Sequence, residues 1–245
     1  MSIDQRQYVI LQLRAPMAAF GGAAIDSFGV TRRLPARSML TGLLANALGY
    51  HRQQFEKLQK LQTRFVFATG IDSPSEGRQF TDFQTAQIHK NDKHWTTRGI
   101  VEGRDGGSGT YDGPHLRYRD YLDDLSVHVA FTLTDTSAEE LDSLVQAFNY
   151  PARPLFIGRK GCLPSAPLYM STVVANTALA ALLTVPIGGD SNVFCQWMEE
   201  GEHDFLEGVS EVQLCDERDW ANGQHAGSRK VYEAAISSRH FAECA

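Results

Sequence analysis

The chain is poor in cysteine and contains no long apolar run. A reducing compartment suits this cysteine usage best. No apolar run approaches the roughly 20 residues that a membrane-spanning helix needs. The first residues, MSIDQRQYVILQL, lack the basic start and the small-residue cleavage site of a signal peptide. These absences predict a cytoplasmic protein with no membrane partner. The sequence contains four cysteines, Cys162, Cys195, Cys215 and Cys244. They are far apart and form no C-x-x-C pair, which argues against a zinc knuckle and against a disulfide scaffold.

Motifs for nucleotide-dependent and zinc-dependent catalysis are missing as well. The sequence has no Walker loop, no G-x-G-x-x-G after an expected strand, no G-x-S-x-G and no H-E-x-x-H. RNA cleavage without a metal would instead need a base and an acid on either side of a 2′-OH, usually supplied by His, Tyr or Lys. The residues that could serve are not paired by any characteristic spacing: His51, His89, His94, His115, Tyr118, His128 and Lys160.

Basic residues are in the minority, because the formal net charge is −6. At face value this charge argues against a nucleic-acid partner. The acidic residues are concentrated, however, since residues 190–219 hold ten of them and one base, Arg218. The rest of the chain has 22 Lys and Arg against 19 Asp and Glu, a net charge of +3. Such asymmetry can direct a polyanion to one end of a molecule and a basic protein to the other.

A helix is predicted over Leu34–Gly49, directly after Arg32 and Arg33. Pro35 suits a first helical turn, and Gly49 can end the helix. The free N–H groups and partial positive charge of a helix N-terminus suit an anion such as phosphate. We therefore expect an open, basic N-terminus that binds phosphate; an ordinary core helix with solvated arginines is the alternative. The apolar side chains recur at helical spacing: Leu40, Leu43, Leu44, Ala47 and Leu48.

A second basic loop is predicted at Ile157–Pro164. Gly158 and Gly161 bracket Arg159 and Lys160 there. Two cations on a turn with accessible backbone N–H groups form a nest that can bind an anion. A surface hairpin with solvated charges is the alternative.

Residues 70–113 show no lasting period and end in a glycine-rich run. A segment of this length without regular structure is usually functional or disordered. Bases stack on aromatic rings while cations meet phosphates, so this composition suits a single-stranded nucleic acid. A mobile loop with a few hydrophobic anchors is the alternative. The aromatic residues and the cations that alternate here are Phe80, Phe83, Trp95 and Tyr111, and Arg78, Lys90, Lys93, Arg98 and Arg104.

The other patterns predict short strands, a loop, a short polar helix or turn at His51–Leu61, and one further helix. A capping box of Ser137 and Glu140 begins a helix that ends at Pro151, and Arg14–Gly22 is expected to be a loop because it holds a proline and a glycine pair. Strands are expected at Tyr8–Leu13, Thr63–Thr69, Leu116–Leu122, Val127–Leu133 and Leu155–Ile157, the third and fourth as a hairpin through Asp123 and Asp124.

This order of elements predicts an α+β fold. It is close to the β-α-β-β-α-β ferredoxin-like arrangement, with an additional strand in the middle. Residues 165–245 read as a smaller, β-rich C-terminal part. Since this fold hosts many functions, it does not name one.

Six segments, in this order, resemble the CasD family of subunits from the type I-E CRISPR Cascade complex, a branch of the CRISPR-associated RAMP proteins. The resemblance extends from the first expected strand to about Asp190. The segments are RAPMAAFGG (14–22), LPARSMLTGLLANALG (34–49), FTDFQTAQ (80–87), LRYRDYLDDLSVHVAFTL (116–133), PLFIGRKGCLPSAPLY (154–169) and PIGGD (186–190).

The resemblance implies a fold and a role. The fold would be a ferredoxin-like (RRM-like) RAMP domain over residues 1–164, with a thumb inserted at about 70–115, and a small β-rich part over 165–245. The role would be a non-catalytic RNA-binding subunit that holds the 5′ handle of the crRNA and caps the backbone next to the large subunit, in antiviral defence. Its partners would be the crRNA and the backbone and large subunits of Cascade. Target DNA would be reached indirectly, and no cofactor or metal is implied.

The same resemblance implies where RNA would be bound. Contacts would lie at the start of the first helix, at the root of the thumb, on the strand leading from it and in the second basic loop. The residues carried over by motif are Arg32, Arg33, Arg37 and Ser38, then Gln84 and Thr85, then Arg117, Tyr118 and Arg119, and finally Arg159 and Lys160.

Two other functions stay open from the sequence. A related branch, from type I-C systems, cuts its own precursor transcript, so a metal-independent endoribonuclease is one alternative. An unrelated small-molecule enzyme on the same fold is the other, and it would show no RNA affinity and a dry apolar pocket.

Overall fold

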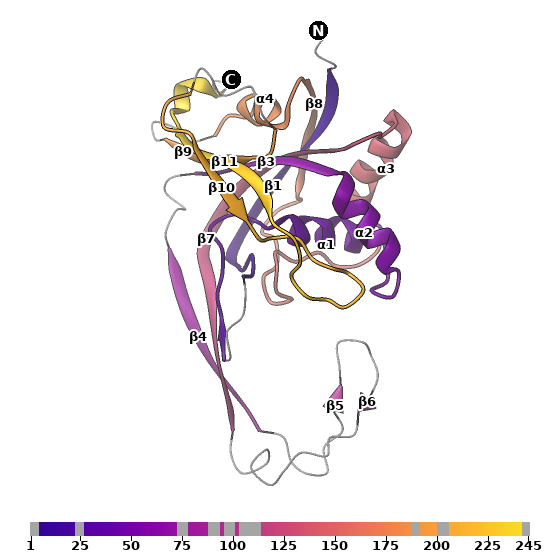
Figure 1. The fold of residues 1–245 in the computed structure, drawn as a ribbon, viewed down its shortest axis with the longest axis vertical. Helices are drawn as coiled ribbons and strands as arrows, with labels where there is room; N and C mark the ends of the chain where they lie inside the picture. The colour runs from indigo at the N-terminus through magenta and orange to yellow at the C-terminus, as the bar shows by residue number, and fades with distance from the viewer. Residues whose placement is uncertain are drawn as a thin grey trace.

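The computed structural model describes residues 5–22, 27–72, 78–87, 94–95, 101–102, 114–187, 192–199 and 206–241. One large sheet organises them (Figure 1). Its centre has the strand order β8-β1-β7-β3, and each neighbouring pair is antiparallel. These strands are β1 (Arg6–Ala18), β3 (Phe65–Asp72), β7 (His115–Leu133) and β8 (Tyr169–Ala175).

Three strands from the C-terminal third continue the same sheet beyond β3. They are β9 (Val193–Trp197), β10 (Ser210–Leu214) and β11 (Arg229–Ile236), in the order β3-β9-β11-β10. The sheet therefore joins both halves of the sequence, since β8 pairs with β1 and β9 pairs with β3. The division at residue 164 stays a prediction.

Helices lie on both faces of this sheet. α1 (Arg37–Ala47) and α2 (Phe55–Arg64) connect β1 to β3, and α3 (Ala138–Asn149) connects β7 to β8. These three cover one face, over a core that includes Val9, Leu11 and Phe131. α4 (Ala178–Leu183) covers the other face, over Tyr8, Ile10 and Ala130. The alternation of β1 thus supplies both cores, because successive side chains point to opposite faces of a strand.

Local signals set the ends of the helices. Gly49 takes a φ of +78° directly after the α1 C-cap, as the expected helix end requires. The Ser137 hydroxyl accepts a hydrogen bond from the Glu140 N–H and begins α3. The carboxylate of Glu140 accepts from Arg64, and this guanidinium holds the pKa of Glu140 below its usual range. The pair fixes α3 against the end of α2.

β1 is longer than the sequence indicated. Residues 14–18, expected to be a loop, continue the strand and pair with residues 122–126 of β7. The pairing passes from Ala15 and Leu125 to Met17 and Asp123 and leaves out Pro16, which has no N–H to donate to the ladder. A long-range ladder thus outweighed the local signal for a turn.

The predicted hairpin at Asp123 and Asp124 is wrong. β7 passes through both residues as one strand of 19 residues. The positive φ of Asp124 shifts the alternation of the strand, so Leu122 and Leu125 are both buried although they are three residues apart. This break in the period was the feature that resembled a turn.

The other expectations had mixed outcomes. The strand expected at Leu155–Ile157 is not formed, because Ile157 belongs to a tight loop in which its N–H donates to Cys162 O. The strands that were not predicted from the sequence include β9, the short β2 (Phe28–Gly29), which pairs with β7, and β4 (Gln79–Ala86), which lies in the segment expected to lack regular structure. A 3-10 helix, η3 (Ser238–His240), follows β11.

A long two-stranded extension leaves the body of the molecule. It is formed by β4 (Gln79–Ala86) and the first half of β7, which pair from Gln79 with Leu122 to Ala86 with His115. We call this extension, together with β2, the arm. Figure 1 shows it pointing away from the helices. β5 (His94–Trp95) and β6 (Val101–Glu102) form a separate two-stranded pair.

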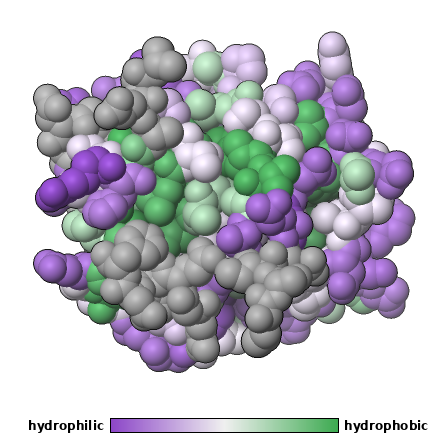
Figure 2. Space-filling view, turned by 90° about the horizontal axis from the view of Figure 1, so that it is seen from above, coloured by the Kyte–Doolittle hydropathy of each residue, from purple (hydrophilic) through white to green (hydrophobic). Residues whose placement is uncertain are grey.

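The opposite end of the molecule has a different character. Figure 2 views it from above and shows apolar side chains gathered among hydrophilic ones. None of the described helices combines the length and the apolar character that crossing a membrane requires.

Candidate nucleic-acid interface

The N-terminus of α1 is closed, contrary to the expected open phosphate site. The Asp216 carboxylate accepts from the Arg37 N–H at 2.8 Å, and Asp216 O accepts from the Ser38 N–H at 3.1 Å. Arg229 donates two further hydrogen bonds to this carboxylate, at 2.9 and 2.7 Å. The amide groups that suit an anion are thus satisfied by an acidic side chain of the same chain.

The arginines around this helix end are engaged in contacts within the protein. The Arg37 guanidinium pairs with Glu217 and donates to Thr63 O, and burial lowers its pKa. Arg32 donates to Cys215 O at 2.6 Å, and the guanidinium carbon of Arg33 lies 3.5 Å from the centre of the Phe194 ring. Arg32, Arg33 and Arg37, which we call the basic cluster, therefore attach the C-terminal third of the chain to the start of α1.

The second basic loop is fixed to the end of β1. Gly158 has a φ of +91°, and a Cβ there would lie 1.6 Å from Ala19 O, so only glycine fits. The Ala19 N–H donates to Ile157 O, which attaches the loop to the strand. Lys160 follows, exposed to solvent.

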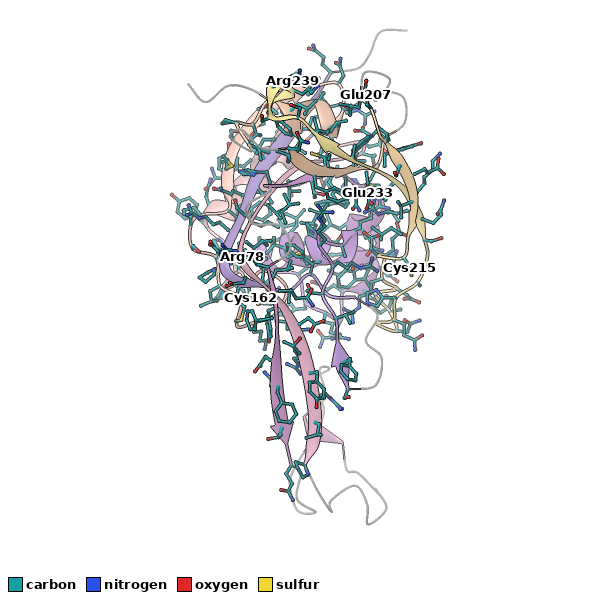
Figure 3. The ribbon with its side chains drawn as sticks, turned by 90° about the vertical axis from the view of Figure 1, so that its left-hand side faces the viewer. Arg78, Cys162, Glu207, Cys215, Glu233 and Arg239 are labelled. Atoms are coloured by element: carbon teal, nitrogen blue, oxygen red, sulfur yellow. The ribbon has the colours of Figure 1, made fainter. Side chains whose placement is uncertain are left out.

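Arg159 is directed into the root of the arm. Its guanidinium donates to Asp120 O of β7 at 2.9 Å and to Gly29 O of β2 at 3.0 Å. Its guanidinium carbon also lies 4.6 Å from the centre of the Tyr121 ring. One side chain thus holds two strands of the arm, a role that the sequence analysis did not predict. Figure 3 shows the labelled Arg78 and Cys162 at this root.

The two faces of the arm differ in chemistry. Strand alternation places Leu116, Tyr118 and Asp120 on one face and Arg117, Arg119 and Tyr121 on the other. On the first face, the Tyr118 ring is stacked on Phe28 with centroids 4.9 Å apart and lies 5.2 Å from Phe83. We call the first face the aromatic face and the second the basic face.

Two arginines meet on the basic face beside Gly29. A Cβ at Gly29 would lie 3.0 Å from Nη2 of Arg159 and 3.7 Å from Cγ of Arg119. Arg117 lies two residues further out on the same face, and both it and Arg119 are exposed. The structure therefore brings Arg117, Arg119 and Arg159 to one face, with Lys160 on the adjoining loop.

The remaining expected residues divide between the faces. Gln84 and Thr85 lie toward the outer end of the arm and not at its root, where the resemblance implied them, because the pairing of β4 with β7 starts at Gln79 and Leu122 and runs outward. Gln84 is paired with Arg117 on the basic face, where its amide donates to the Asp82 carboxylate at 2.6 Å. Thr85 is paired with Leu116 on the aromatic face and is exposed. Tyr118 also lies on the aromatic face, away from the arginines that flank it in sequence. Period-2 alternation in residues 116–121 could have predicted this separation.

Several residues named from the sequence cannot be placed. Trp95, Tyr111 and the cations of residues 88–113 lie outside the described side chains, as do His89, His94 and His115. His128 is buried, and burial lowers its pKa to about 4. The described residues bring together no group of three or more His, Cys, Asp or Glu side chains that could hold a metal ion.

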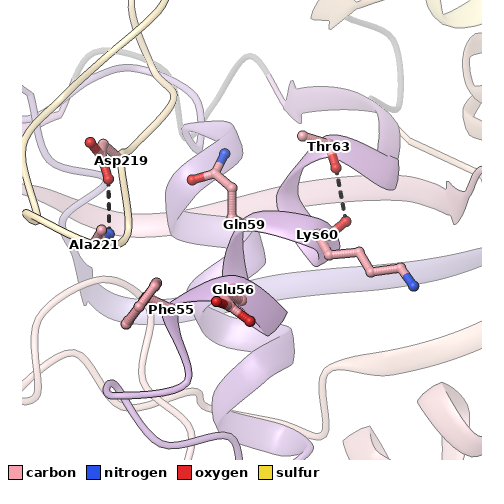
Figure 4. A pocket seen from close by; sticks show the side chains of 7 residues that line it. All are labelled: Phe55, Glu56, Gln59, Lys60, Thr63, Asp219 and Ala221. Carbon is pink, nitrogen blue, oxygen red and sulfur yellow. Dashed lines mark hydrogen bonds between the residues drawn. The ribbon is translucent and has the colours of Figure 1, made fainter.

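A groove of about 460 Å³ lies between α2 and the segment at 219–221 (Figure 4). The Asp219 carboxylate accepts from the Ala221 N–H, and the Thr63 hydroxyl donates to Lys60 O. The groove contains none of the expected RNA-binding residues, and it is open at the surface, with charged side chains among those that line it. Its lining residues are Phe55, Glu56, Gln59, Lys60, Thr63, Asp219 and Ala221.

Comparison with known proteins gives consistent results. A model of the family described as CRISPR-associated protein (Cas_Cas5) matches residues 8–232. The "CRISPR system Cascade subunit CasD" of Escherichia coli (strain K12) is 30% identical over 200 residues, which are 81% of this chain and 85% of that protein.

Two solved structures share the fold. A chain of a "CRISPR RNA-guided surveillance complex" has a TM-score of 0.62 at 22% identity, covering 94% of this chain and 90% of that chain. A chain from "Crystal structure of Cas protein" has a TM-score of 0.62 at 19% identity, covering 97% and 98%.

Proposed function

The chain belongs to the Cas_Cas5 family of CRISPR-associated proteins, and from this we propose that it is a non-catalytic RNA-binding subunit of a Cascade surveillance complex of type I-E. Its RNA is the crRNA, held at the 5′ handle. Its protein partners are the backbone and large subunits, and target DNA is reached through the complex. This RNA-binding role serves antiviral defence. Its similarity to a named Cascade subunit supports this proposal.

We also propose an interpretation of the fold. The unit of β1, β3, β7 and β8 with helices α1 to α3 is a ferredoxin-like RAMP domain, and the arm is part of its thumb. The strand order β8-β1-β7-β3 and the helix connections support this. Residues 165–245 form the small β-rich part, with β8 contributed to the sheet of the first domain.

The observation that carries the RNA-binding proposal is the basic face. Cations on an exposed face can neutralise RNA phosphates, and each such contact releases counterions. The expected contacts are now Arg117, Arg119 and Lys160, since these are exposed. The cluster at α1 has a smaller part in the proposal, because Arg32 and Arg37 are engaged within the protein.

The test measures binding of the full chain to its own single-stranded repeat RNA over a range of salt. Arg119→Ala and Lys160→Ala should each weaken binding and lower the slope of log K against log salt by about 0.7–1. Arg239→Ala is the matched control, because Arg239 lies on η3 at the opposite end of the molecule (Figure 3). Unchanged affinity and slope in the first two variants would contradict the proposal.

The same preparation distinguishes binding from cleavage. The wild-type chain is incubated with the repeat transcript in EDTA and the RNA is separated under denaturing conditions. We expect intact RNA. A discrete cut within the repeat would contradict the non-catalytic role and identify a metal-independent endoribonuclease.

A further inference from the structure

Three side chains form a stack at the root of the arm. Phe80 of β4 and Tyr121 of β7 are paired across the strands, and their rings are stacked with centroids 5.4 Å apart and planes 18° apart. Arg159 lies over the Tyr121 ring. Tyr121 is only 7% exposed, whereas Phe80 is 42% exposed. The stack therefore holds the Phe80 ring from within the protein and leaves part of it open to solvent.

This exposed ring lies on the same face as the cations. Because Phe80 is directly opposite Tyr121, it shares the basic face with Arg117 and Arg119. The basic face also holds one carboxylate, that of Asp82, which lies opposite Arg119 and accepts a hydrogen bond from the Gln84 amide. On the aromatic face, Asp120 is the only charged residue among the described arm residues. An aromatic surface and a set of cations thus coincide on one side of the arm.

We infer that Phe80 is a stacking site for an unpaired nucleobase. The phosphates next to that base are neutralised by Arg117 and Arg119, so one face takes both parts of a nucleotide. The inference rests on the proposed RNA binding and identifies which part of the RNA this position takes. Stacking on a phenyl ring tolerates any base, because every base has a π-face.

Arg159 is a positioning residue for this site. Its two hydrogen bonds to strand carbonyls fix its guanidinium, and through Tyr121 it fixes the Phe80 ring. A ring that is held before binding loses little freedom when a flat ligand covers it, which favours affinity. This role differs from the phosphate contact that the resemblance implied for Arg159.

A nucleobase suits Phe80 better than an apolar protein side chain does. A protein surface placed on the basic face would remove guanidinium groups from water, and this costs free energy unless acidic groups pair with them. The aromatic face offers Phe28, 54% exposed, and Phe83, 53% exposed, without that cost. RNA supplies phosphates that pair with the guanidinium groups and a base that can cover the Phe80 ring, so it suits both features of the basic face.

The experiment compares two ligands of equal length and charge: the single-stranded repeat RNA and its abasic counterpart. Phe80→Ala in the full chain should lower the affinity for base-bearing RNA by about 5- to 100-fold. It should leave the affinity for the abasic strand and the salt slope unchanged, because no phosphate contact is lost. Phe80→Trp should retain binding. Phe80→Leu keeps apolar contact with Tyr121 but lacks a π-face, and should behave as Phe80→Ala.

Two control variants test the position. Phe83→Ala alters an exposed ring on the opposite face of the same strand, and Phe55→Ala alters a ring of similar exposure on α2. Both should leave the affinity for base-bearing RNA unchanged. An equal loss in Phe83→Ala, or an equal loss for the abasic strand in Phe80→Ala, would overturn the inference.

The outcomes separate the inference from the proposed function. Salt-dependent RNA binding that Phe80→Ala and Phe80→Leu leave intact would overturn the stacking site and keep the RNA-binding role. A wild-type chain without salt-dependent RNA binding would overturn both.

Discussion

The carboxylate of Asp216 belongs to a residue that is completely buried in the protein. Three hydrogen bonds reach that carboxylate, from the Arg37 N–H and from two nitrogens of Arg229. Burying a charge is costly unless it is paired and hydrogen-bonded, and this geometry meets both conditions. Removing one partner leaves the other charge buried without compensation. At the scale of the residue, we therefore expect Asp216 to tolerate substitution poorly.

Asp216→Ala should therefore lower the free energy of unfolding by about 3–5 kcal/mol. The matched control is Glu211→Ala, because Glu211 makes an exposed pair with Lys230 at 3.5 Å and should contribute less than about 1 kcal/mol. Urea unfolding followed by circular dichroism measures both. Equal effects in the two variants would contradict the role given to the buried pair.

His128 should make stability depend on pH. Its pKa is lowered to about 4 in the folded protein, against an ordinary value of 6.5, because burial disfavours the charged form. Between these values the unfolded chain binds a proton that the folded chain does not, so stability falls as pH decreases from 6.5 to 4. We expect the free energy of unfolding to be about 2 kcal/mol smaller at pH 5 than at pH 7.

The contribution of His128 is isolated by its substitution. His128→Gln should remove most of that pH dependence, while the other titratable groups still contribute theirs. Urea unfolding of both proteins at pH 5, 6 and 7 provides the comparison. The same slope in the variant and the wild type would assign the pH dependence to other groups.

At the scale of the element, the loop after α3 depends on one glycine. Gly158 combines a positive φ with a close approach to Ala19 O, so a side chain at this position is excluded twice. Gly161, in the same loop, has a different environment, because an added Cβ would find Cε of Met17 at 3.8 Å, an ordinary contact. The two glycines of the basic loop therefore differ in what they permit.

Gly158→Ala should destabilise the protein strongly. The backbone strain of a non-glycine residue at this φ typically costs about 1–3 kcal/mol, and the clash of the new Cβ with Ala19 O adds to that cost. Gly161→Ala is the control and should change stability by less than about 1 kcal/mol. Thermal unfolding of the two variants checks this. A larger loss of stability in Gly161→Ala than in Gly158→Ala would contradict the contact between Gly158 and Ala19 as the feature that fixes this loop.

The same scale shows what could be predicted from the sequence. The start of α3 at Ser137 and the end of α1 at Gly49 depend on groups within a few residues, and both were predicted. The continuation of β1 beyond Leu13 depends on pairing with β7, and the closure of α1 depends on Asp216, both far away in the sequence. Signals of that kind emerge only when the chain has folded.

In the candidate site, too, local features could be predicted from the sequence and long-range contacts could not. The cations at Arg117, Arg119 and Arg159 were named from the sequence, because glycines and resemblance marked their surroundings. That Arg159 binds strand carbonyls, and that Phe80 stacks on Tyr121, depends on the register between β4 and β7. Periodicity gives the face of a residue, but it does not give the partner across the strand.

At the scale of the whole molecule, one sheet connects the first strand with the last. β9 pairs with both β3 and β11, so residues 193–236 share backbone hydrogen bonds with the central strands. Trp197 is 1% exposed and packs in the core on the α4 face. This connection favours cooperative unfolding of the C-terminal third with the rest.

Native-state hydrogen exchange tests this cooperativity. The amides of Ile10 in β1 and of Cys195 in β9 should exchange with similar free energies of opening, because both strands belong to one sheet. Amides of β4, on the arm, should exchange at lower free energy, because β4 pairs with β7 alone. A much lower value at Cys195 than at Ile10 would indicate an independently unfolding C-terminal unit.

The closure of α1 also has a consequence for biosynthesis. The residue that satisfies the start of this helix lies 179 positions after Arg37. At about 5–20 residues per second, a ribosome needs on the order of 10–35 s to reach it. During that interval the nascent chain carries an uncapped helix end beside three arginines, with none of its final acidic partners yet made. Completion of translation and neutralisation of this basic cluster are therefore coupled in time.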